Sequence, residues 1–384
     1  MKISQVVPLF FPHIGGVEIS VFNLVKKLRE LGQDVSVITS DVPPVGSYSI
    51  SGVKIHRLPV LFRLYDAPFC PSLPIMLSKV RADIIHAHTP PRFFADCVSM
   101  LHKLRFSAAP LILTFHFCLE NAPSLINAIS NFHYNTATPF IFDSCNRIIV
   151  PTESYRVLLL KRFGLCTRKI RVIPHGVDLN EFNPKRFEKE VAKKKYGLSS
   201  KKVVLFIGRL DTEGAEQKGI RYLLEAVPLV VKEVDDVKFV IGGGGKELER
   251  FKDICRHLGI SSYVKFIGRF PYGETPSLIS TADVFVLPSV FESFGIVLCE
   301  AMAMKKPVIS TKIRGVVDVV EDGKTGLLVE PRNPKELAHA VLRILSNKNL
   351  AERLVKEGRK RVEEKYDWNL IVQKILQIYE ECAR

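Results

Sequence analysis

The stretch PSVFESFGIVLCEAMAMKKPVIST, residues 288–311, organises the rest of the chain. A short apolar strand at 283–287 leads into it, and Ser293 is a favourable N-cap, so we predict a helix from about Phe294 to Met304. Gly295 permits a ligand to approach the backbone closely, and the free N–H groups of a helix N-terminus attract anions and hydroxyl groups. The stretch therefore predicts a ligand site where a strand passes into a helix.

Two glutamates in this stretch have different expected surroundings. Glu292 precedes the predicted helix, whereas Glu300 is expected roughly 10 Å farther along its axis, at about 1.5 Å per residue. The helix is apolar nearly all round, so Glu300 is predicted to be a buried carboxylate that needs a hydrogen-bond donor. A nucleotide sugar, with hydroxyl groups at both ends and phosphate between them, fits this spacing. Solvated glutamates on an ordinary α/β loop are the alternative.

Composition limits the class of protein. A chain of 384 residues with 47% hydrophobic and 25% charged residues is expected to form two globular domains. The start, MKISQVVPLF, is too strand-like for a signal peptide, and the eight scattered cysteines indicate reduced thiols in the cytoplasm and no structural zinc. The net charge of +15 suits phosphorylated small molecules or an anionic membrane. We expect no nucleic-acid partner, because no nucleic-acid motif is present.

Strands alternate with helices in both halves of the chain. This alternation predicts two doubly wound, Rossmann-like α/β domains facing across a cleft, at residues 1–180 and 203–366. Residues 181–202 contain Pro184 and many lysines, so we predict a linker there. The amphipathic segment at 367–384 is expected to cross back to the first domain.

Several polar residues are predicted to stand at the carboxyl ends of strands, where ligands of open α/β sheets bind. His88 and His116 each end a buried strand. We interpret His88 as a histidine held by the core, and for His116 a core role and a functional role are equally weighted. Arg209 follows a strand and Lys218 precedes a helix, so this pair is predicted to clamp a diphosphate.

Two glycine-rich segments are weaker signals. Gly15 and Gly16 open the first predicted helix, where a backbone can approach phosphate. The four glycines at 242–245 match neither the ATPase loop nor the dinucleotide fingerprint, because Glu247 replaces the residue that each motif requires. They still permit close approach of a ligand, with a loose turn as the alternative. An ATPase and a dinucleotide oxidoreductase are therefore disfavoured.

Taken together, these segments resemble glycosyltransferase family 4, the retaining nucleotide-sugar enzymes of GT-B fold. The resemblance covers nearly the whole chain and rests on FFPHIGGVE (10–18), ADIIHAHTP (82–90), TFH (114–116), VIPHGVD (172–178), FIGRL and KGI (206–220), IGGGG (241–245), the 288–309 stretch and EDGKTGLLV (321–329). The segment FFPHIGGVE is also similar to the branch that glycosylates phosphatidylinositol and related lipids.

Carried over by position, the resemblance implies a donor-binding set of Gly16, Arg209, Lys218, Glu292, Ser293, Phe294, Gly295 and Glu300. The N–H of Gly16 and the cations of Arg209 and Lys218 would bind the diphosphate. Glu292 and the backbone after it would hold the sugar hydroxyls, and Glu300 the ribose. The gap between Arg209 and Lys218 is longer than the family's usual spacing and contains Glu213 and Glu216, which puts the reach of Lys218 in doubt.

The resemblance also implies catalytic roles for His116, Glu292, Arg209 and Lys218, with His116 beside the transferred sugar. Arg269 and Phe270 are candidate contacts for the base. No D-x-D sequence is present to hold a divalent ion on the diphosphate, so we expect a metal-independent reaction with no cofactor beyond the nucleotide-sugar substrate.

We therefore predict a retaining transferase that moves a hexose from a UDP- or GDP-sugar to a hydroxyl acceptor. The acceptor is either a membrane lipid or lipid-linked glycan, or a soluble sugar. A nucleotide-sugar epimerase of the same fold is a further alternative, whereas a glycosidase requires two carboxylates facing one bond. The base, the sugar and the oligomeric state are left open.

Residues 55–81 and 99–106 bear on the acceptor. They mix large apolar side chains with Arg57, Arg63, Lys79, Arg81, Lys103 and Arg105. This mixture predicts a peripheral contact with the anionic cytosolic face of a membrane. A core helix with a solvated basic edge is the alternative.

Overall fold

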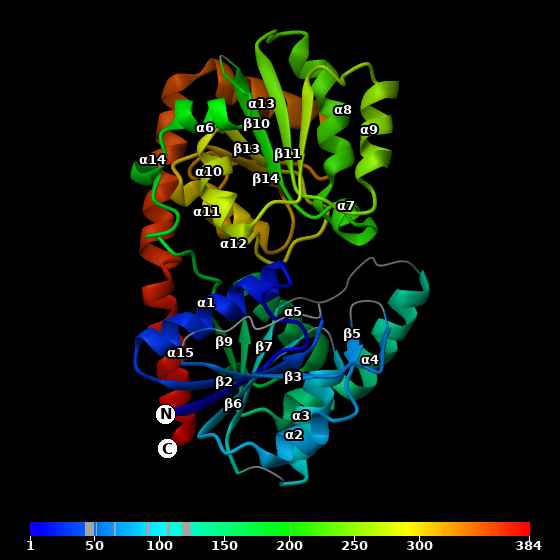
Figure 1. Ribbon diagram of the computed structural model, residues 1–384, viewed down its shortest axis with the longest axis vertical. Coiled ribbons are helices and arrows are strands. Elements are labelled where there is room, and N and C mark those ends of the chain that lie inside the picture. The colour runs from blue at the N-terminus through cyan, green and yellow to red at the C-terminus, as the bar shows by residue number, and fades with distance from the viewer. Residues whose placement is uncertain are drawn as a thin grey trace. The chain divides into compact units, whose positions relative to one another are not determined.

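The computed structural model describes residues 1–42, 50, 52–64, 67–89, 92–105, 108–116, 124–199 and 201–384, without the side chains of residues 64, 92, 124–131 and 212–214. The chain forms two compact units, Met1–Gly176 with Trp368–Arg384, and Val177–Asp367. Each unit contains its own parallel sheet with helices packed on it (Figure 1).

The first unit is built on a seven-stranded sheet of order β3-β2-β1-β6-β7-β8-β9. Its strands are β1 (Lys2–Val6), β2 (Asp34–Ser40), β3 (Lys54–Leu58), β6 (Ile84–Thr89), β7 (Leu111–Phe115), β8 (Arg147–Val150) and β9 (Ile170–Val172). The order reverses between β1 and β6, which makes their carboxyl ends the topological switch point of this sheet. A separate hairpin pairs β4 (Phe62–Leu64) with β5 (Ala67–Phe69).

Two groups of helices cover this sheet. Helices α1 (Gly16–Glu30) and α15 (Trp368–Ala383) pack together. Apolar residues of α1 repeat at helical spacing, and Val21, Leu24 and Leu28 form one hydrophobic core with α15 and the sheet. A second core contains side chains of the remaining helices, α2 (Leu73–Lys79), α3 (Arg92–Lys103), α4 (Ser124–Ser144) and α5 (Glu153–Phe163). The 3-10 turn η1 (Thr167–Lys169) leads into β9.

The second unit is built on a six-stranded parallel sheet of order β12-β11-β10-β13-β14-β15. Its strands are β10 (Lys202–Ile207), β11 (Val237–Gly242), β12 (Val264–Gly268), β13 (Val284–Leu287), β14 (Val308–Thr311) and β15 (Leu327–Val329). Here the order reverses between β10 and β13. The loops that follow these two strands carry Arg209 and Glu292 respectively, so the switch point lies where the sequence placed its candidate ligand groups.

One continuous core fills the second unit. Helix α8 (Ile220–Val231) packs beside α9 (Leu248–His257) and α13 (Pro334–Ser346), and α11 (Ile296–Ala303) packs on β13, β14 and α14 (Lys348–Lys365). The shorter elements are η2 (Pro184–Arg186), α6 (Lys189–Lys195), α7 (Thr212–Lys218), η3 (Tyr272–Glu274), α10 (Thr275–Ser280) and α12 (Val316–Val319). Within the described ranges, no helix combines the length and apolarity needed to cross a bilayer.

The prediction of a linker at 181–202 is wrong. These residues belong to the second unit and carry η2 and α6. Phe182 and Leu198 are each 1% exposed in its core. The lysines that suggested a solvated linker have tertiary partners, because Lys189 and Lys193 both pair with Asp283. Lysine content was therefore misread as exposure.

Candidate functional site

The loop that carries Glu292 differs from the sequence prediction in its cap. Helix α11 begins at Ile296, and its N-cap is Gly295, whose φ of 81° lies in the left-handed region that favours glycine. Ser293 does not cap the helix; instead its backbone N–H donates to Glu292 Oε1 at 3.2 Å. A Cβ on Gly315 would lie 2.4 Å from the carbonyl oxygen of Ser293. The loop at Gly315 thus lies close against the turn at Ser293. The intrinsic preference of serine for N-cap positions does not take such a neighbouring loop into account.

Glu292 and Lys218 form an ion pair at the switch point of the second sheet. Lys218 is the last residue of α7, and Gly219 turns the chain into α8 with a φ of 65°. A Cβ on Gly219 would lie 2.0 Å from the carbonyl oxygen of Pro288, so the two loops are in close contact. Lys218 therefore reaches the loop that carries Glu292, and its reach to a diphosphate stays a prediction.

Arg209 stands at the same edge, directly after β10. Its side chain is nearly half exposed, and its Nε lies 3.5 Å from a carboxylate oxygen of Asp211. Arg209 comes after β10 and Lys218 ends α7, so two cations lie at one carboxyl edge of the sheet. Cations in this position are able to neutralise a phosphate-bearing ligand.

Glu300 is buried, as the sequence predicted, and has the donor that such a carboxylate needs. It is 4% exposed, and the hydroxyl of Tyr272 donates to its Oε1 at 2.9 Å. Burial raises the pKa of Glu300 to about 7, against the smaller opposing effect of the Tyr272 hydrogen bond. Because α11 begins at Ile296, Glu300 lies in the second turn of the helix rather than two full turns beyond its start.

The glycines at 242–245 have a structural role that the sequence did not reveal. A Cβ on Gly243, whose φ is 124°, would lie 1.9 Å from the carbonyl oxygen of Gly208, and one on Gly244 would lie 2.6 Å from Arg269 Cγ. Phe270 is a similar neighbour of Gly242. These glycines therefore let three loops at the carboxyl edge pack on one another. Arg269 and Phe270, the candidate base contacts, belong to this packing.

In the first unit, Gly16 is the first residue of α1 and Gly15 is its N-cap. The carboxylate of Glu18 folds back over this turn: a Cβ on Gly15 would lie 2.3 Å from Glu18 Oε2, and Glu18 also pairs with His13 at 3.5 Å. The positive end of the helix dipole stabilises a negatively charged carboxylate in the first turn. A diphosphate bound at Gly16 would therefore share this N-terminus with an anion that the chain already supplies.

His116 and His88 lie together in the first unit, 2% exposed each, with 3.1 Å between His116 Nε2 and His88 Nδ1. His175 stacks on His116 with nearly parallel rings, and its Nδ1 is 2.7 Å from Ser20 Oγ. Burial lowers the pKa of His175 to about 4 and of His86 to about 3, and that of His88 and His116 well below the usual value. The cluster is therefore uncharged at neutral pH, and His88 is held by the core as expected.

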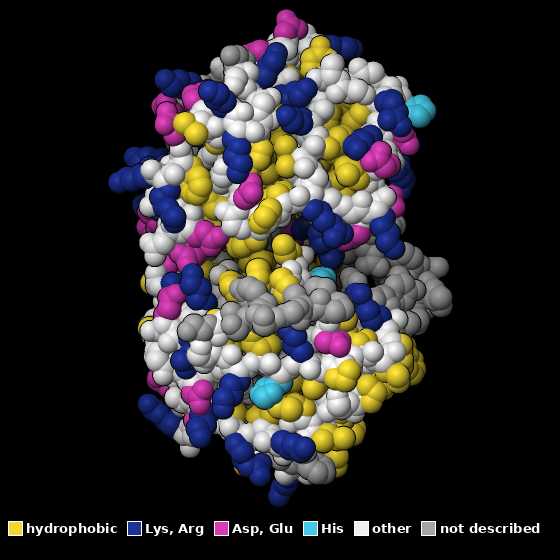
Figure 2. Space-filling model, in the orientation of Figure 1, with side chains coloured by type: hydrophobic (Ala, Val, Ile, Leu, Met, Phe, Trp, Pro, Cys, Tyr) yellow, Lys and Arg dark blue, Asp and Glu magenta, His cyan; other side chains and the backbone are white. Residues whose placement is uncertain are grey.

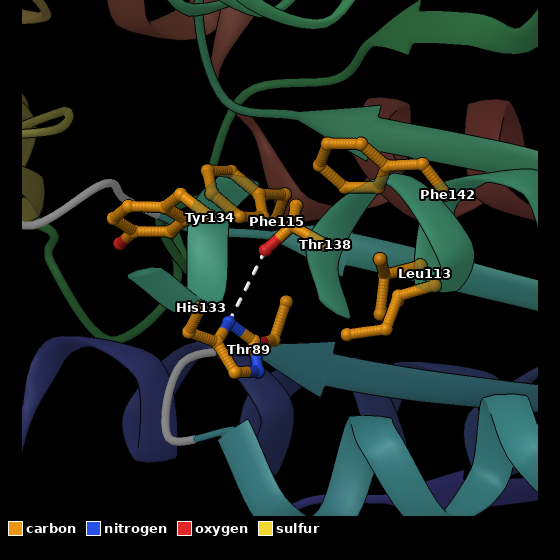
Figure 3. Close-up of a pocket in the computed structure, with 8 residues that line it drawn as sticks. Thr89, Leu113, Phe115, His133, Tyr134, Thr138 and Phe142 are labelled. Atoms are coloured by element: carbon orange, nitrogen blue, oxygen red, sulfur yellow. Dashed lines mark hydrogen bonds between the residues drawn. The ribbon is translucent and has the colours of Figure 1, made fainter. Parts of the chain in front are cut away.

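A small pocket in the first unit was not predicted from the sequence. It is lined by Thr89, Leu113, Phe115, His133, Tyr134, Thr138, Ile141 and Phe142 (Figure 3). Thr138 points toward His133, with 3.2 Å between its Oγ1 and His133 Nδ1, and the other ring nitrogen of His133 is 3.0 Å from Asp96. Both ring nitrogens of His133 are thus already engaged, one by Thr138 in the lining and the other by Asp96.

Sequence reasoning missed three residues that contact the candidate groups, one in the second unit and two in the first. Tyr272 supports Glu300 from 28 residues away, and no local pattern indicates this. His175 is the stacking partner of His116, although it lies in the quoted segment VIPHGVD. Gln5 had a signal: it is a polar residue within a strand whose neighbours are apolar, and such a residue needs a buried partner.

Comparisons with known proteins agree with this geometry. Residues 14–181 match the family model described as Glycosyltransferase Family 4, and residues 188–361 match Glycosyl transferases group 1. An uncharacterized glycosyltransferase of Methanocaldococcus jannaschii is 30% identical, covering 99% of this chain and 98% of the relative. The phosphatidyl-myo-inositol mannosyltransferase of Mycolicibacterium smegmatis is also 30% identical, covering 100% and 94%. The solved structure of Anabaena HepE in complex with UDP-glucose has a TM-score of 0.80 at 18% identity, covering 99% and 100%.

Two parallel sheets in separate units and the likeness to this solved structure define a GT-B fold. The chain belongs to glycosyltransferase family 4. It is a retaining hexosyltransferase that takes its sugar from a nucleotide sugar.

Proposed function

We propose that the donor is a UDP- or GDP-hexose and that the acceptor is a hydroxyl of a membrane lipid or lipid-linked glycan. On the donor side, Arg209, Lys218 and the N–H of Gly16 bind the diphosphate. Glu300 accepts hydrogen bonds from the ribose, and Glu292, with the backbone of the turn after it, from the hexose. Ser293, Phe294 and Gly295 form that turn, with Arg269 and Phe270 nearest the base and His116 beside the transferred sugar.

The charges of the second unit support this assignment. Breaking the bond between sugar and diphosphate places negative charge on the leaving phosphate, and fixed cations stabilise that charge where it develops. Lys218 is paired with Glu292, so a diphosphate would draw the ammonium toward itself and leave the Glu292 carboxylate for the sugar hydroxyls.

The observation that carries the lipid acceptor is an apolar and basic face on the first unit, which we call the α2–α4 face. Its members are exposed large apolar side chains on β4, α2, α3, α4 and the loops beside β4 and α3: Leu61, Phe62, Ile75, Met100, Leu104, Phe132 and Phe140. These elements contact one another through α3. A contiguous patch of exposed apolar side chains on a protein surface is typical of an interaction site.

Exposed cations accompany these side chains. Arg63, Lys79, Arg81, Lys103 and Arg105 are all exposed, whereas Arg57 is half-buried and donates to the carbonyl oxygen of Phe11. Figure 2 shows hydrophobic and Lys or Arg side chains intermingled on this part of the first unit. Each cation near an anionic surface contributes about 1 kcal/mol of binding, and apolar side chains between the cations enter the headgroup region. The face thus matches a peripheral membrane contact.

The test is sedimentation of the protein with anionic phospholipid vesicles at low salt. Wild-type protein should sediment with the vesicles and leave them as salt increases, because screening weakens the attraction. Replacing Arg63, Lys79, Arg81, Lys103 and Arg105 by Gln should abolish binding without changing the affinity for UDP or GDP.

A matched control removes five charges elsewhere. Lys335, Arg343, Lys348, Lys356 and Lys360 are exposed on the second unit, and their Gln variant should keep most of the vesicle binding. Equal loss in both variants would show only a dependence on net charge. If wild-type protein ignores the vesicles and glycosylates a soluble sugar well, the lipid acceptor is wrong while the transferase stands.

A further inference from the structure

One ring nitrogen of His116, Nδ1, has no hydrogen-bond partner among the described residues, although the residue is only 2% exposed. An unpartnered buried polar atom costs about 1–3 kcal/mol, so each one in a native structure needs an explanation, and a bound ligand is one of them. His116 directly follows β7, at the edge of the sheet where ligands bind. The nitrogen is therefore a candidate ligand contact, and its protonation decides what it binds.

The opposite nitrogen of His116 is the end of a hydrogen-bonded chain, which we call the relay. His116 Nε2 lies 3.1 Å from His88 Nδ1, and His88 Nε2 lies 2.8 Å from Gln5 Oε1. Gln5 Nε2 donates to the Tyr379 hydroxyl at 3.1 Å, and that hydroxyl is 2.7 Å from His86 Nδ1. The last contact, also 2.7 Å, joins His86 Nε2 to a threonine hydroxyl, Thr114 Oγ1. Every member is buried.

A relay of neutral imidazoles has only two consistent directions. Each neutral ring carries one N–H and one lone pair, so fixing the proton on one ring fixes it on the next. The pKa of His86, His88 and His116 is lowered by burial, which keeps all three rings neutral at pH 7. Within the described ranges no group of three or more side chains is arranged to hold a metal, so the rings do not form a metal site.

Gln5 sets the direction. An O–H···O bond usually spans about 2.7–2.8 Å and an N–H···O bond about 2.9–3.0 Å, so the 3.1 Å contact with Tyr379 fits donation by the amide N–H rather than by the hydroxyl. The amide oxygen then faces His88 Nε2, which must donate to it, so His88 Nδ1 accepts from His116 Nε2. The reverse direction would leave a buried N–H of His116 without an acceptor, which native structures rarely tolerate. The two contacts of His86 are equally short and favour neither direction.

We propose that Gln5 and His88 are positioning residues that hold His116 as its Nε2–H tautomer, so that Nδ1 presents a fixed lone pair to a hydroxyl group of the bound sugar. Tyr379, on the C-terminal helix α15, orients the amide of Gln5 and so belongs to the same device. His175, stacked on His116, limits rotation of its ring.

This arrangement makes His116 an acceptor only. A hydroxyl group of the ligand donates a hydrogen bond to Nδ1, whereas a group without a hydrogen to donate forms no hydrogen bond there and binds more weakly. The identification of the ligand as the transferred hexose rests on the proposed function, but the tautomer does not: it is a property of the free protein.

The experiment is long-range ¹H–¹⁵N correlation spectroscopy on protein labelled with ¹⁵N-histidine at pH 7, with the His116 signals assigned from a His116→Gln variant. The expected spectrum of wild-type protein shows protonated Nε2 and unprotonated Nδ1. A protonated Nδ1, in either the other tautomer or the imidazolium, overturns the proposal without any variant.

Two variants test the positioning residues. Gln5→Met keeps the length of the side chain and removes both contacts, so His116 should become a mixture of tautomers and kcat should fall about tenfold, the scale of one hydrogen bond, while the Kd of UDP and GDP stays unchanged. Tyr379→Phe should do the same to a smaller extent. The control is Ser4→Ala, a buried neighbour of Gln5 on β1 outside the relay, which should leave the tautomer and kcat unchanged. An unchanged tautomer in Gln5→Met would overturn the role of Gln5.

A titration separates this proposal from the proposed function. UDP-glucose or GDP-mannose should shift the Nδ1 resonance of His116, whereas UDP and GDP should not. If the nucleotide sugar binds without moving that resonance, the contact with a sugar hydroxyl is wrong. If neither nucleotide sugar binds at all and the Nε2–H tautomer is nevertheless observed, the donor assignment fails and the relay stands.

Discussion

Both units place polar groups at the carboxyl edge of a parallel sheet. These groups are neutral in the first unit and charged in the second. In the first unit, four buried histidines are neutral and satisfied mainly by one another and by neutral partners. In the second unit, Glu292 is paired with Lys218 and Arg209 lies beside Asp211, so charge is retained near the surface. Burial explains the difference, because a buried site tolerates neutral hydrogen-bonded groups far better than ions.

The comparison also teaches how one fold serves two tasks. Neutral groups in a dry site have fixed donors and acceptors and are suited to recognising the pattern of sugar hydroxyls. Partly exposed cations are suited to attracting and neutralising phosphate. Glu300 is the exception in the second unit: it is buried like the histidines, and its pKa is raised to about 7 by that burial.

The largest expected effect is acid unfolding of the first unit. A histidine whose folded pKa is lowered binds its proton more readily when unfolded, so stability is full above the usual pKa of 6.5 and falls as pH decreases below it. By pH 4.5 the cost is on the order of 2–3 kcal/mol for each of His86 and His175, whose pKa is lowered to about 3 and about 4, and His88 and His116 act in the same direction. This loss is a large part of the stability of a typical domain.

The chain offers a reporter for this prediction. Trp368 is the sole tryptophan, and it is 2% exposed in the core of the first unit. Urea unfolding followed by tryptophan fluorescence should give a midpoint that falls steeply from pH 7 to pH 4.5. A midpoint that stays constant over this range would mean that the histidine cluster is not held neutral.

The next effect has the opposite sign and belongs to the second unit. The folded pKa of Glu300 is about 7, above its usual value of 4.5, so the folded state binds the extra proton and its stability falls as pH rises through that window. The change is on the order of 3 kcal/mol. Glu300→Gln should remove it, seen as a difference between the two proteins in urea unfolding by circular dichroism at pH 5 and pH 8. Identical pH profiles would contradict the assignment.

Donor binding tests whether the exposed cations act on phosphate. Arg209→Ala should weaken the binding of UDP or GDP by about 1.5–3 kcal/mol, because the lost hydrogen bonds are charge-assisted. Isothermal titration calorimetry measures this directly. Arg221→Ala is the matched control, since Arg221 is exposed on α8 and pairs with Glu225, so this variant should bind nucleotide normally. Unchanged affinity in a folded Arg209→Ala protein would remove Arg209 from the site.

A smaller effect separates the two glutamates. Glu300→Ala should weaken bare UDP or GDP by about tenfold, the scale of one to two hydrogen bonds to the ribose. Glu292→Ala should leave bare nucleotide nearly unchanged and weaken only the nucleotide sugar. The same calorimetric titrations, with and without the hexose, check both variants. Equal loss of bare nucleotide in the two variants would show that the division of roles is wrong.

Local patterns predicted the elements well and their contacts poorly. The apolar helix around Glu300 and the burial of that carboxylate follow from residue types within one segment. Its donor, Tyr272, does not, since the contact spans 28 residues. The same holds for the relay, where Tyr379 reaches His86 across 293 positions of sequence. Long-range partners depend on sheet order, which residue spacing alone does not specify.

The errors also have a physical pattern. Ser293 was predicted as a cap from its intrinsic preference, but the close loop at Gly315 goes with a turn in which Gly295 takes that role. The alternative of a loose turn for the glycines at 242–245 is wrong, because other loops pack closely against them, and close approach of a ligand stays a prediction. In each case a neighbour distant in sequence decided the conformation, as it did for the lysines of 181–202.

The smallest expected effect is that of a chelator. The chain has no D-x-D sequence to place a divalent ion on the diphosphate, and we expect the cations at the switch point of the second sheet, Arg209 and Lys218, to supply positive charge there instead. Excess EDTA should therefore leave the rate of sugar transfer unchanged within error. Arg209→Ala offers the sharper form of the test: if fixed cations carry the charge, added magnesium or manganese should not restore its activity. Wild-type activity that vanishes with EDTA and returns with either metal would instead show that an ion neutralises the leaving diphosphate, and the contrast between a neutral first unit and a cationic second unit would lose its catalytic meaning.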